Sequence, residues 1–267
     1  MVSLLWQSAA FIAIGSIAGL LGGLLGIGGG TVIVPCLYIV FKYAGLPQSS
    51  LMQMAVGTSL ASIVFSTLSS SMAHNKRGAV DKNVLRRMIP GIILGCIIGS
   101  LLADSISSTL LEVFFGIFAI TLSIYFLKAK HEVLDEGNLP SSPLLDISAF
   151  VIAVISSILG IGGGVMFVPY LHAHRFHEKK AIGTSSALSV CISLVAAISY
   201  LFFGLTDVSE FLCFGYIYLP AFICISISSY LIAPLGANLA HSLPSIILKR
   251  LFAFFMLCVG LLMIFKG

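Results

Sequence analysis

The most constraining feature of this sequence is a glycine cluster that interrupts two long apolar runs. Leu24–Leu37 reads LLGIGGGTVIVPCL and Ile158–Leu171 reads ILGIGGGVMFVPYL, with the GIGGG and the later Val-Pro at identical spacing. Each glycine inside a helix costs about 1 kcal/mol relative to alanine. Neither run is therefore an ordinary transmembrane helix, and both are predicted to break and reverse at their glycines.

The composition places this chain in a membrane. It is 58% hydrophobic and only 9% charged, with a mean hydropathy of +1.11, whereas soluble domains carry about 25% charged residues. Apolar stretches long enough to cross a hydrocarbon core of about 30 Å recur from end to end. We predict an all-α polytopic membrane protein with no room for a soluble domain.

The two halves of the chain are predicted to be repeats. AVGTSLA (Ala55–Ala61) matches AIGTSSA (Ala181–Ala187) in the same order relative to the two glycine clusters. This gives a first repeat at 1–127, a cytoplasmic linker at 128–144 and a second repeat at 145–267. Each repeat has a glycine-broken helix pair, or hairpin, followed by three transmembrane helices. The expected segments are Leu4–Val40, Leu51–Ala73, Val84–Ala103 and Thr109–Leu127, then Leu145–Leu171, Ala181–Phe203, Phe211–Ala233 and Ile246–Phe265.

Basic residues predict the topology. If every segment crosses the membrane once, the loops on the two sides carry eight and six Lys and Arg residues, which gives no orientation. If each broken segment instead returns to the side from which it entered, the two sides carry twelve and two. The smaller group is Lys42 and Lys266. The larger group is Lys76, Arg77, Lys82, Arg86, Arg87, Lys128, Lys130, Arg175, Lys179, Lys180, Lys249 and Arg250. Positive loops stay in the cytoplasm, so both termini are expected on the outer face.

An odd number of net crossings per repeat makes the second repeat inverted, which is typical of secondary transporters. The charge count depends only on the second broken segment, because no basic residue precedes the first. It leaves open whether the first broken segment is re-entrant or makes two full crossings.

The two breaks are the predicted binding site. Non-helical backbone at membrane depth is tolerated only where protein buries it or water lines it. Half-helix N-termini present N–H groups and a positive dipole end, which suits a small anion. The candidate residues are Gly28, Gly29, Gly30 and Thr31 in the first break, and Gly162, Gly163 and Gly164 in the second.

Polar side chains near the breaks are further candidates. The Gly-Thr-Ser motifs place hydroxyl groups at the start of the helix after each break, and an amide precedes the first motif. These residues are Gly57, Thr58 and Ser59, then Gly183, Thr184 and Ser185, with Gln53. The alternative is that the hydroxyls bond back to their own helix. By contrast, glycines spaced by four (Gly15, Gly19 and Gly23; Gly91, Gly95 and Gly99) are expected to pack helices closely.

The other ionisable residues have simpler expected roles. Asp81 precedes a helix and is expected to cap it, and Glu112 is placed at the interface, with proton coupling as the alternative. His172, His174 and His177 form a histidine-rich loop that we expect to be solvated rather than metal-binding. No catalytic constellation, no cofactor motif and no nucleic-acid-binding pattern is visible, so an enzyme is not expected.

The motifs together resemble a known family. GGLLGIGGGTVIVP, ILGIGGGVMFVP, AVGTS, AIGTS and HNKRGAVD are similar to those of the TauE/SafE family of sulfite and sulfonate exporters, within the 4-toluene sulfonate uptake permease-like superfamily. The resemblance places the family glycines on Gly26, Gly28, Gly29 and Gly30, and on Gly160, Gly162, Gly163 and Gly164. The family loop falls on His74, Arg77, Gly78, Val80 and Asp81. The second half departs there, with Tyr200 and Phe203 in place of His74 and Arg77.

The resemblance implies a carrier in the plasma (inner) membrane that exports sulfite, sulfoacetate or related organosulfonates. Its expected partners are the small anion and the lipid bilayer, and a homo-oligomer is left open. Membrane potential favours outward movement of an anion by about 2.3 kcal/mol per charge per 100 mV. The alternatives are an importer, a carrier of a different small ion including a metal cation, a membrane enzyme and a structural subunit.

Overall fold

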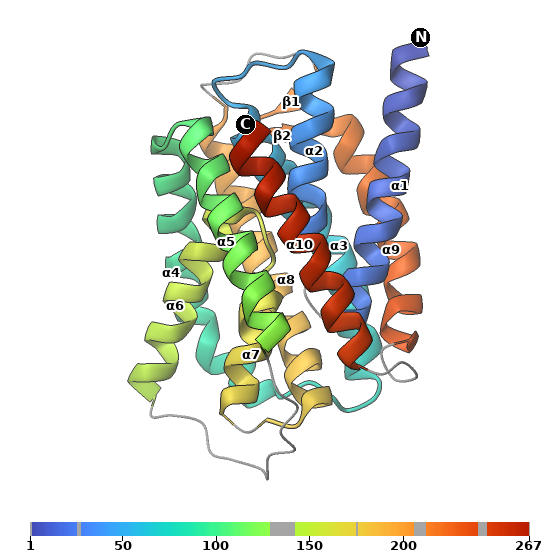
Figure 1. The fold of residues 1–267 in the computed structure, drawn as a ribbon. Coiled ribbons are helices and arrows are strands. Elements are labelled where there is room, and N and C mark those ends of the chain that lie inside the picture. The colour runs from blue at the N-terminus through green and yellow to red at the C-terminus, as the bar shows by residue number, and fades with distance from the viewer. Residues whose placement is uncertain are drawn as a thin grey trace.

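The computed structural model describes residues 2–25, 28–128, 142–174, 176–205, 212–239 and 245–266. Within them the chain is a bundle of ten helices and one two-stranded hairpin (Figure 1). The elements are α1 (Val2–Leu25), α2 (Gly30–Ala44), α3 (Leu51–Asn75), α4 (Lys82–Ser105), α5 (Ser108–Lys128), α6 (Ser142–Leu159), α7 (Gly164–Ala173), α8 (Glu178–Phe203), β1 (Cys213–Phe214), β2 (Ile217–Tyr218), α9 (Leu219–Leu239) and α10 (Ser245–Lys266).

Six helices of the described chain are long and apolar enough to cross a membrane, namely α1, α3, α4, α5, α8 and α9. The prediction of an all-α polytopic membrane protein is therefore confirmed. The predicted repeats at 1–127 and 145–267 are not tested by this count. Of the predicted linker at 128–144, residues 129–141 lie outside the described residues.

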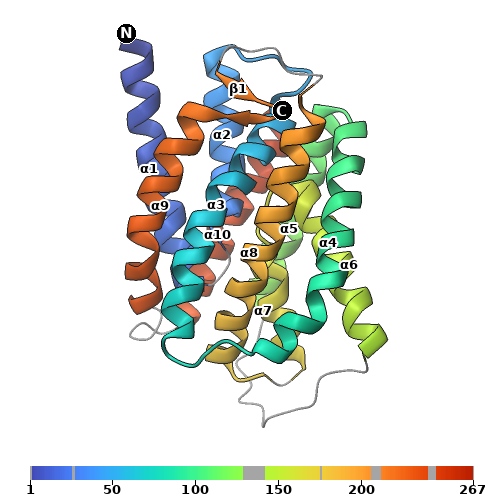
Figure 2. The same ribbon diagram turned by 180° about the vertical axis from the view of Figure 1, so that it is seen from behind.

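The two broken segments point in opposite directions. Both chain termini lie at one end of the bundle, α2 runs from its break toward that end, and α7 runs from its break toward the other end (Figures 1 and 2). With 10 residues, α7 is about 15 Å long, which is half the thickness of a hydrocarbon core. The inverted relation of the halves, and the side of the membrane that each end faces, stay predictions.

One predicted helix boundary is wrong. The segment Phe211–Ala233 was expected to be helical from its start, but β1 and β2 pair antiparallel there, with Cys213 opposite Tyr218. Gly215 makes the turn with a φ of +57°, a conformation that residues with a side chain rarely adopt. The following helix, α9, therefore begins only at Leu219 and ends at Leu239.

Glycines spaced by four hold neighbouring helices together, as predicted. A Cβ atom added at Gly91, Gly95 or Gly99 of α4 would lie 2.5, 2.5 and 2.6 Å from carbonyl oxygens of α6. Small residues permit this close backbone approach inside a membrane, where packing rather than hydrophobicity drives helix association. The glycine face of α4 therefore fixes the position of α6. It also fixes the position of the second break, which follows α6 in the chain.

Helix α3 lies at the centre of the fold and is buried along most of its length. It packs against α8 in an antiparallel pair (Figure 2), and the hydroxyl groups of Ser70 and Ser186 are 3.5 Å apart across this contact. Both central helices begin directly after a broken segment and carry the Gly-Thr-Ser motifs. Both helices pack directly against the breaks.

Replacing Gly95 with leucine is expected to destabilise the protein, because its side chain has no space beside the Phe150 carbonyl. Overpacking of this kind costs typically about 1–3 kcal/mol. Thermal unfolding in detergent should show a clear drop in Tm for Gly95→Leu. The control Ile98→Phe adds bulk at an exposed position of the same helix and should leave Tm nearly unchanged; equal values for the two variants would contradict this packing.

Candidate functional site

The two glycine breaks are in direct contact. A Cβ atom on Gly30 would lie 2.6 Å from the carbonyl oxygen of Gly160 and 2.9 Å from the Cα atom of Ile161. A Cβ atom on Gly28 would lie 3.9 Å from the Cα atom of Gly162. The structure thus brings the two predicted breaks together, and only glycine permits this distance at Gly30.

Glycines in the left-handed conformation occur in both breaks. Gly28 and Gly29 have φ values of +76° and +79°, and Gly160 and Gly163 have values of +72° and +75°. L-residues with a side chain rarely adopt this left-handed conformation. The reversal ends with Gly29 and Gly163 as the N-cap residues of α2 and α7. Gly26, which the resemblance added, lies outside the described residues.

Both helices that begin at the breaks have uncapped N-termini. Neither Gly29 nor Gly163 supplies a side-chain cap. Among the described residues, no hydrogen bond uses the N–H group of Gly30, Thr31 or Gly164 as its donor. Such orphan N–H groups, together with the positive end of the helix dipole, attract negative charge.

Two buried hydroxyl groups beside these N-termini have no hydrogen-bond partner in the described chain. Thr31 in the first turn of α2 and Ser156 of α6 are both 0% exposed, and neither Thr31 Oγ1 nor Ser156 Oγ is bonded. Ser156 Oγ lies 3.3 Å from the position of a Cβ atom on Gly163. An unsatisfied buried hydroxyl costs about 1–3 kcal/mol, so both mark places where a polar ligand is favoured.

The central helices hold the carbonyl groups of the breaks. Ser59 Oγ of α3 donates to the Gly160 carbonyl oxygen at 2.9 Å, and Ser66 Oγ donates to that of Gly28 at 3.2 Å. Ser185 Oγ of α8 donates to the Gly164 carbonyl oxygen at 3.5 Å. A hydroxyl has one proton to donate. In this conformation, therefore, Ser59 and Ser185 position the breaks and have no proton left for an anion.

Sequence reasoning missed Ser66 and Ser156. The signal for Ser66 was present, because hydroxyl residues recur every three or four positions along both central helices, as on one face of a helix. These residues are Thr58, Ser59, Ser62, Ser66, Ser69 and Ser70 in α3, and Thr184, Ser185, Ser189 and Ser193 in α8.

An isoleucine closes the contact between the breaks. The Cδ1 atom of Ile63, which is fully buried, lies 3.4 Å from the Cβ position of Gly30 and 3.3 Å from that of Gly162. The described conformation is therefore occluded at this point.

The two Gly-Thr pairs contact connections of the opposite half rather than the breaks. Thr58 Oγ1 accepts a hydrogen bond from Tyr218 N at 2.9 Å and donates to Tyr216 O at 3.4 Å. Thr184 Oγ1 accepts a hydrogen bond from Asp81 N at 3.0 Å. Gly57 and Gly183 permit the approach, because a Cβ atom there would meet the carbonyl oxygens of Tyr216 and Ala79. Each half thus anchors a connection of the other.

The remaining candidates lie away from the breaks. The Gln53 amide nitrogen donates to Ile106 O at 2.8 Å, and Arg77 donates to Asn238 Oδ1 at 2.6 Å. His74 is buried at the end of α3. Asp81 Oδ1 accepts hydrogen bonds from the N–H groups of the first α4 turn, which confirms its predicted capping role.

The histidine-rich loop offers no metal ligand set in the part of the chain that is described. His174 Nδ1 lies 2.8 Å from the Tyr170 carbonyl oxygen, and His172 and His177 are partly or fully exposed. No group of three or more His, Cys, Asp or Glu side chains comes together among the described residues.

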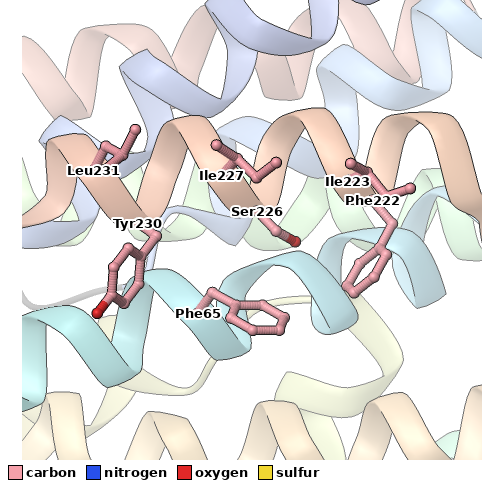
Figure 3. A pocket seen from close by; sticks show the side chains of 7 residues that line it. All are labelled: Phe65, Phe222, Ile223, Ser226, Ile227, Tyr230 and Leu231. Carbon is pink, nitrogen blue, oxygen red and sulfur yellow. The ribbon is translucent and has the colours of Figure 1, made fainter.

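An open groove between α3 and α9 has the wrong chemistry for an anion. It has a volume of about 340 Å³ and apolar walls (Figure 3). Ser226 is the single aliphatic hydroxyl in its lining, and Phe65 and Ile227 are 40% and 57% exposed on the outer surface of the bundle. This surface suits hydrocarbon, so the contact between the breaks remains the candidate site.

Comparison with known proteins identifies the family. The sequence profile described as Sulfite exporter TauE/SafE matches residues 11–263. The chain belongs to this family. TauE/SafE proteins are membrane transporters and not enzymes, and this chain is accordingly a multi-pass membrane transporter.

Relatives agree with this assignment. A "Probable membrane transporter protein" of Haemophilus influenzae is 33% identical, with 96% of this chain and 97% of the relative covered. "Probable membrane transporter protein MJ0441" of Methanocaldococcus jannaschii is 30% identical, covering 84% and 80%. "Probable membrane transporter protein YunE" of Bacillus subtilis is 32% identical, covering 72% and 78%. No solved structure matches this TauE/SafE protein.

Gly160→Ala tests the close packing of the second break against α2 and α3, and Gly45→Ala is its matched control. Both glycines have a positive φ, but a Cβ atom on Gly160 would lie 3.0 Å from the Val56 Cα atom, whereas nothing lies within 4 Å of one on Gly45. The conformational strain of about 1–2 kcal/mol is shared. Gly160→Ala should therefore lower the Tm in detergent distinctly more than Gly45→Ala; equal losses would show that the close approach at Gly160 has no energetic weight.

Proposed function

We propose that this TauE/SafE protein exports small sulfur-containing oxyanions, such as sulfite, sulfoacetate or related organosulfonates, through one site at the contact between its glycine breaks. The observation that carries the proposal is the pair of uncapped helix N-termini. Those of α2 and α7 begin at contacting breaks and have unbonded N–H groups in the described chain. Thr31 and Ser156 add unpartnered hydroxyl groups beside them.

Neutral donors fit a multivalent oxyanion. Every Lys and Arg whose side chain is described is exposed, while Gly28, Gly30 and Gly162 are buried. The anion is therefore held by N–H and O–H groups and not by a buried cation. Several acceptor oxygens on one small ligand match several convergent donors, and a cation placed there would meet the positive ends of two helices.

Transport requires the occluded contact to open on alternate sides. Ile63 blocks the contact, and Thr58 and Thr184 hold the connections of the opposite half. Rocking of one repeat against the other would move α3 and α8 past the breaks while the site stays fixed, as in other transporters with broken helices. The two threonine anchors lie where such rocking changes contacts.

The outward direction follows from charge and potential. With the basic loops in the cytoplasm and the termini outside, the cell interior is negative relative to the end that carries the termini. An anion leaving through the bundle gains about 2.3 kcal/mol per charge per 100 mV. Efflux therefore needs no tightly held ion within the site itself.

Thr31→Val is expected to weaken anion binding without loss of stability, because it removes a hydroxyl that has no partner in the described chain. Lost hydrogen bonds to a charged group cost about 1.5–3 kcal/mol, which predicts affinity lower by about tenfold or more. Thermal shift with sulfite, sulfate, thiosulfate, sulfoacetate and taurine measures the affinity, and efflux of the same compounds from proteoliposomes measures transport. The control is Thr121→Val, whose exposed hydroxyl bonds only within α5; identical affinities in both variants would count against the site.

Thr58→Val and Thr184→Val are expected to slow efflux while the protein still reaches the membrane. Each loses the acceptor for a backbone N–H of the opposite half, worth about 0.5–1.5 kcal/mol. Thr58→Ser and Thr184→Ser keep the hydroxyl and should restore efflux toward the wild-type rate. Normal efflux in both valine variants would remove the anchors from the mechanism.

A further inference from the structure

A polar cavity lies at the end of the bundle that carries the termini, away from the glycine breaks. It measures about 130 Å³ and is formed by α2, α5 and the connection into α3. Lys42, Gln48 and Thr109 are exposed at its rim, and Glu112 is buried in its wall. The cavity thus joins a buried carboxylate to solvent at one end of the protein.

Glu112 is unlike the other described acidic side chains. It is 3% exposed, and its Oε1 atom has no hydrogen-bond partner among the described residues. Asp81, Asp104 and Asp146 are all partly exposed. An unsatisfied oxygen on a buried, ionised carboxylate is costly, whereas a proton on that oxygen removes the charge.

The groups around Glu112 accommodate both of its protonation states. The Tyr38 hydroxyl donates a hydrogen bond to the carboxylate, and the Lys42 ammonium group of α2 is close enough to attract it. Lys42 is exposed and lies 5.6 Å from the Tyr38 ring centroid, so it reaches the cavity from its rim. Leu51 is the cavity residue of α3. The described contacts of α10 with α5, through Ala253, Gly260 and Ile264, are apolar or to the backbone.

Helix α2 connects this cavity to the breaks. Tyr38 and Thr31 are seven residues apart and therefore lie on the same face of α2. One end of α2 begins at Gly30, in contact with Gly160, and the other end carries the groups that interact with Glu112. A change in how Glu112 holds α2 is transmitted along one short helix to the contact between the breaks.

We propose that Glu112 is a proton-binding site of this transporter and that its protonation controls the opening of the contact between the breaks. A proton from water at the end that carries the termini adds to Glu112 Oε1, and the carboxylate changes from −1 to neutral. Lys42 keeps its charge, so the cavity becomes net positive. The attraction between the Glu112 carboxylate of α5 and Lys42 of α2 is then lost. The freed α2 lets the contact between the breaks open. The proton later returns to water through the same cavity, and the attraction between the Glu112 carboxylate and Lys42 is restored.

Infrared difference spectroscopy of the purified full-length protein tests the site without requiring transport. The wild-type protein should show, at a higher frequency than hydrated carboxylic acids, the C=O band of a buried carboxylic acid that appears as pH falls, and Glu112→Gln should lack this band. Asp146→Asn, which alters a partly exposed carboxylate of α6, should keep it. A band of equal size in Glu112→Gln would overturn the proposal.

A second variant keeps the test decisive if Glu112→Gln does not fold. Lys42→Met removes the positive charge beside the carboxylate, so the protonated band should persist to higher pH than in the wild-type protein. An unchanged titration in Lys42→Met would show that the titrating group is not in this cavity.

Coupling is tested by anion efflux from proteoliposomes at a series of external pH values. Acidifying the side that carries the termini should accelerate efflux in the wild-type and Asp146→Asn proteins, and this acceleration should be absent in Glu112→Gln. Acceleration retained in Glu112→Gln would overturn the coupling. This coupling rests on the proposed function; if no protein moves an anion, that function fails, while the infrared band still decides whether Glu112 binds a proton.

Discussion

The contact between the backbones of Gly30 and Gly160 is the constraint on which the rest of this structure depends. Two chain reversals occupy the same small volume, so neither can carry a side chain at the point of contact. The consequence is that two helix N-termini begin close together inside an apolar bundle. A membrane offers no water to satisfy them, and the fold therefore contains a place where negative charge is favoured although every described Lys and Arg is exposed.

The polar groups of the breaks are satisfied unequally. The carbonyl groups of Gly28, Gly160 and Gly164 accept hydrogen bonds from serines of the two central helices. The N–H groups that begin α2 and α7 have no such partner in the described chain. The bonded carbonyl groups hold the breaks in place, and the unbonded N–H groups are available to a ligand. This asymmetry favours an anion over a cation more strongly than the glycine pattern alone.

Much of the fold could be predicted because the same motifs, GIGGG and Gly-Thr-Ser, occur in both halves of the sequence. Two GIGGG clusters in equivalent positions predicted that the breaks meet, and glycines spaced by four predicted close helix packing, but not that α6 is the partner of α4. The β1–β2 hairpin was not predicted, because CFGYIY is apolar enough to read as part of a membrane helix. The hydrogen-bond partner of each hydroxyl group could not be predicted either. Ser59 and Thr58 are neighbours, yet one bonds a break and the other bonds a connection, and only the tertiary structure assigns their partners.

The reciprocal threonine anchors have a consequence for the way this protein is made. Thr58 and Tyr216 are 158 residues apart, and Asp81 and Thr184 are 103 apart. When the ribosome has produced only the first half of the chain, the partners of Thr58 do not yet exist, and Asp81 N has no Thr184 hydroxyl to bind. These hydrogen bonds between the halves can therefore form only after the second half of the chain has been made. Correct assembly is decided late in synthesis, when the α8–α9 connection reaches Thr58 and the two halves close on each other.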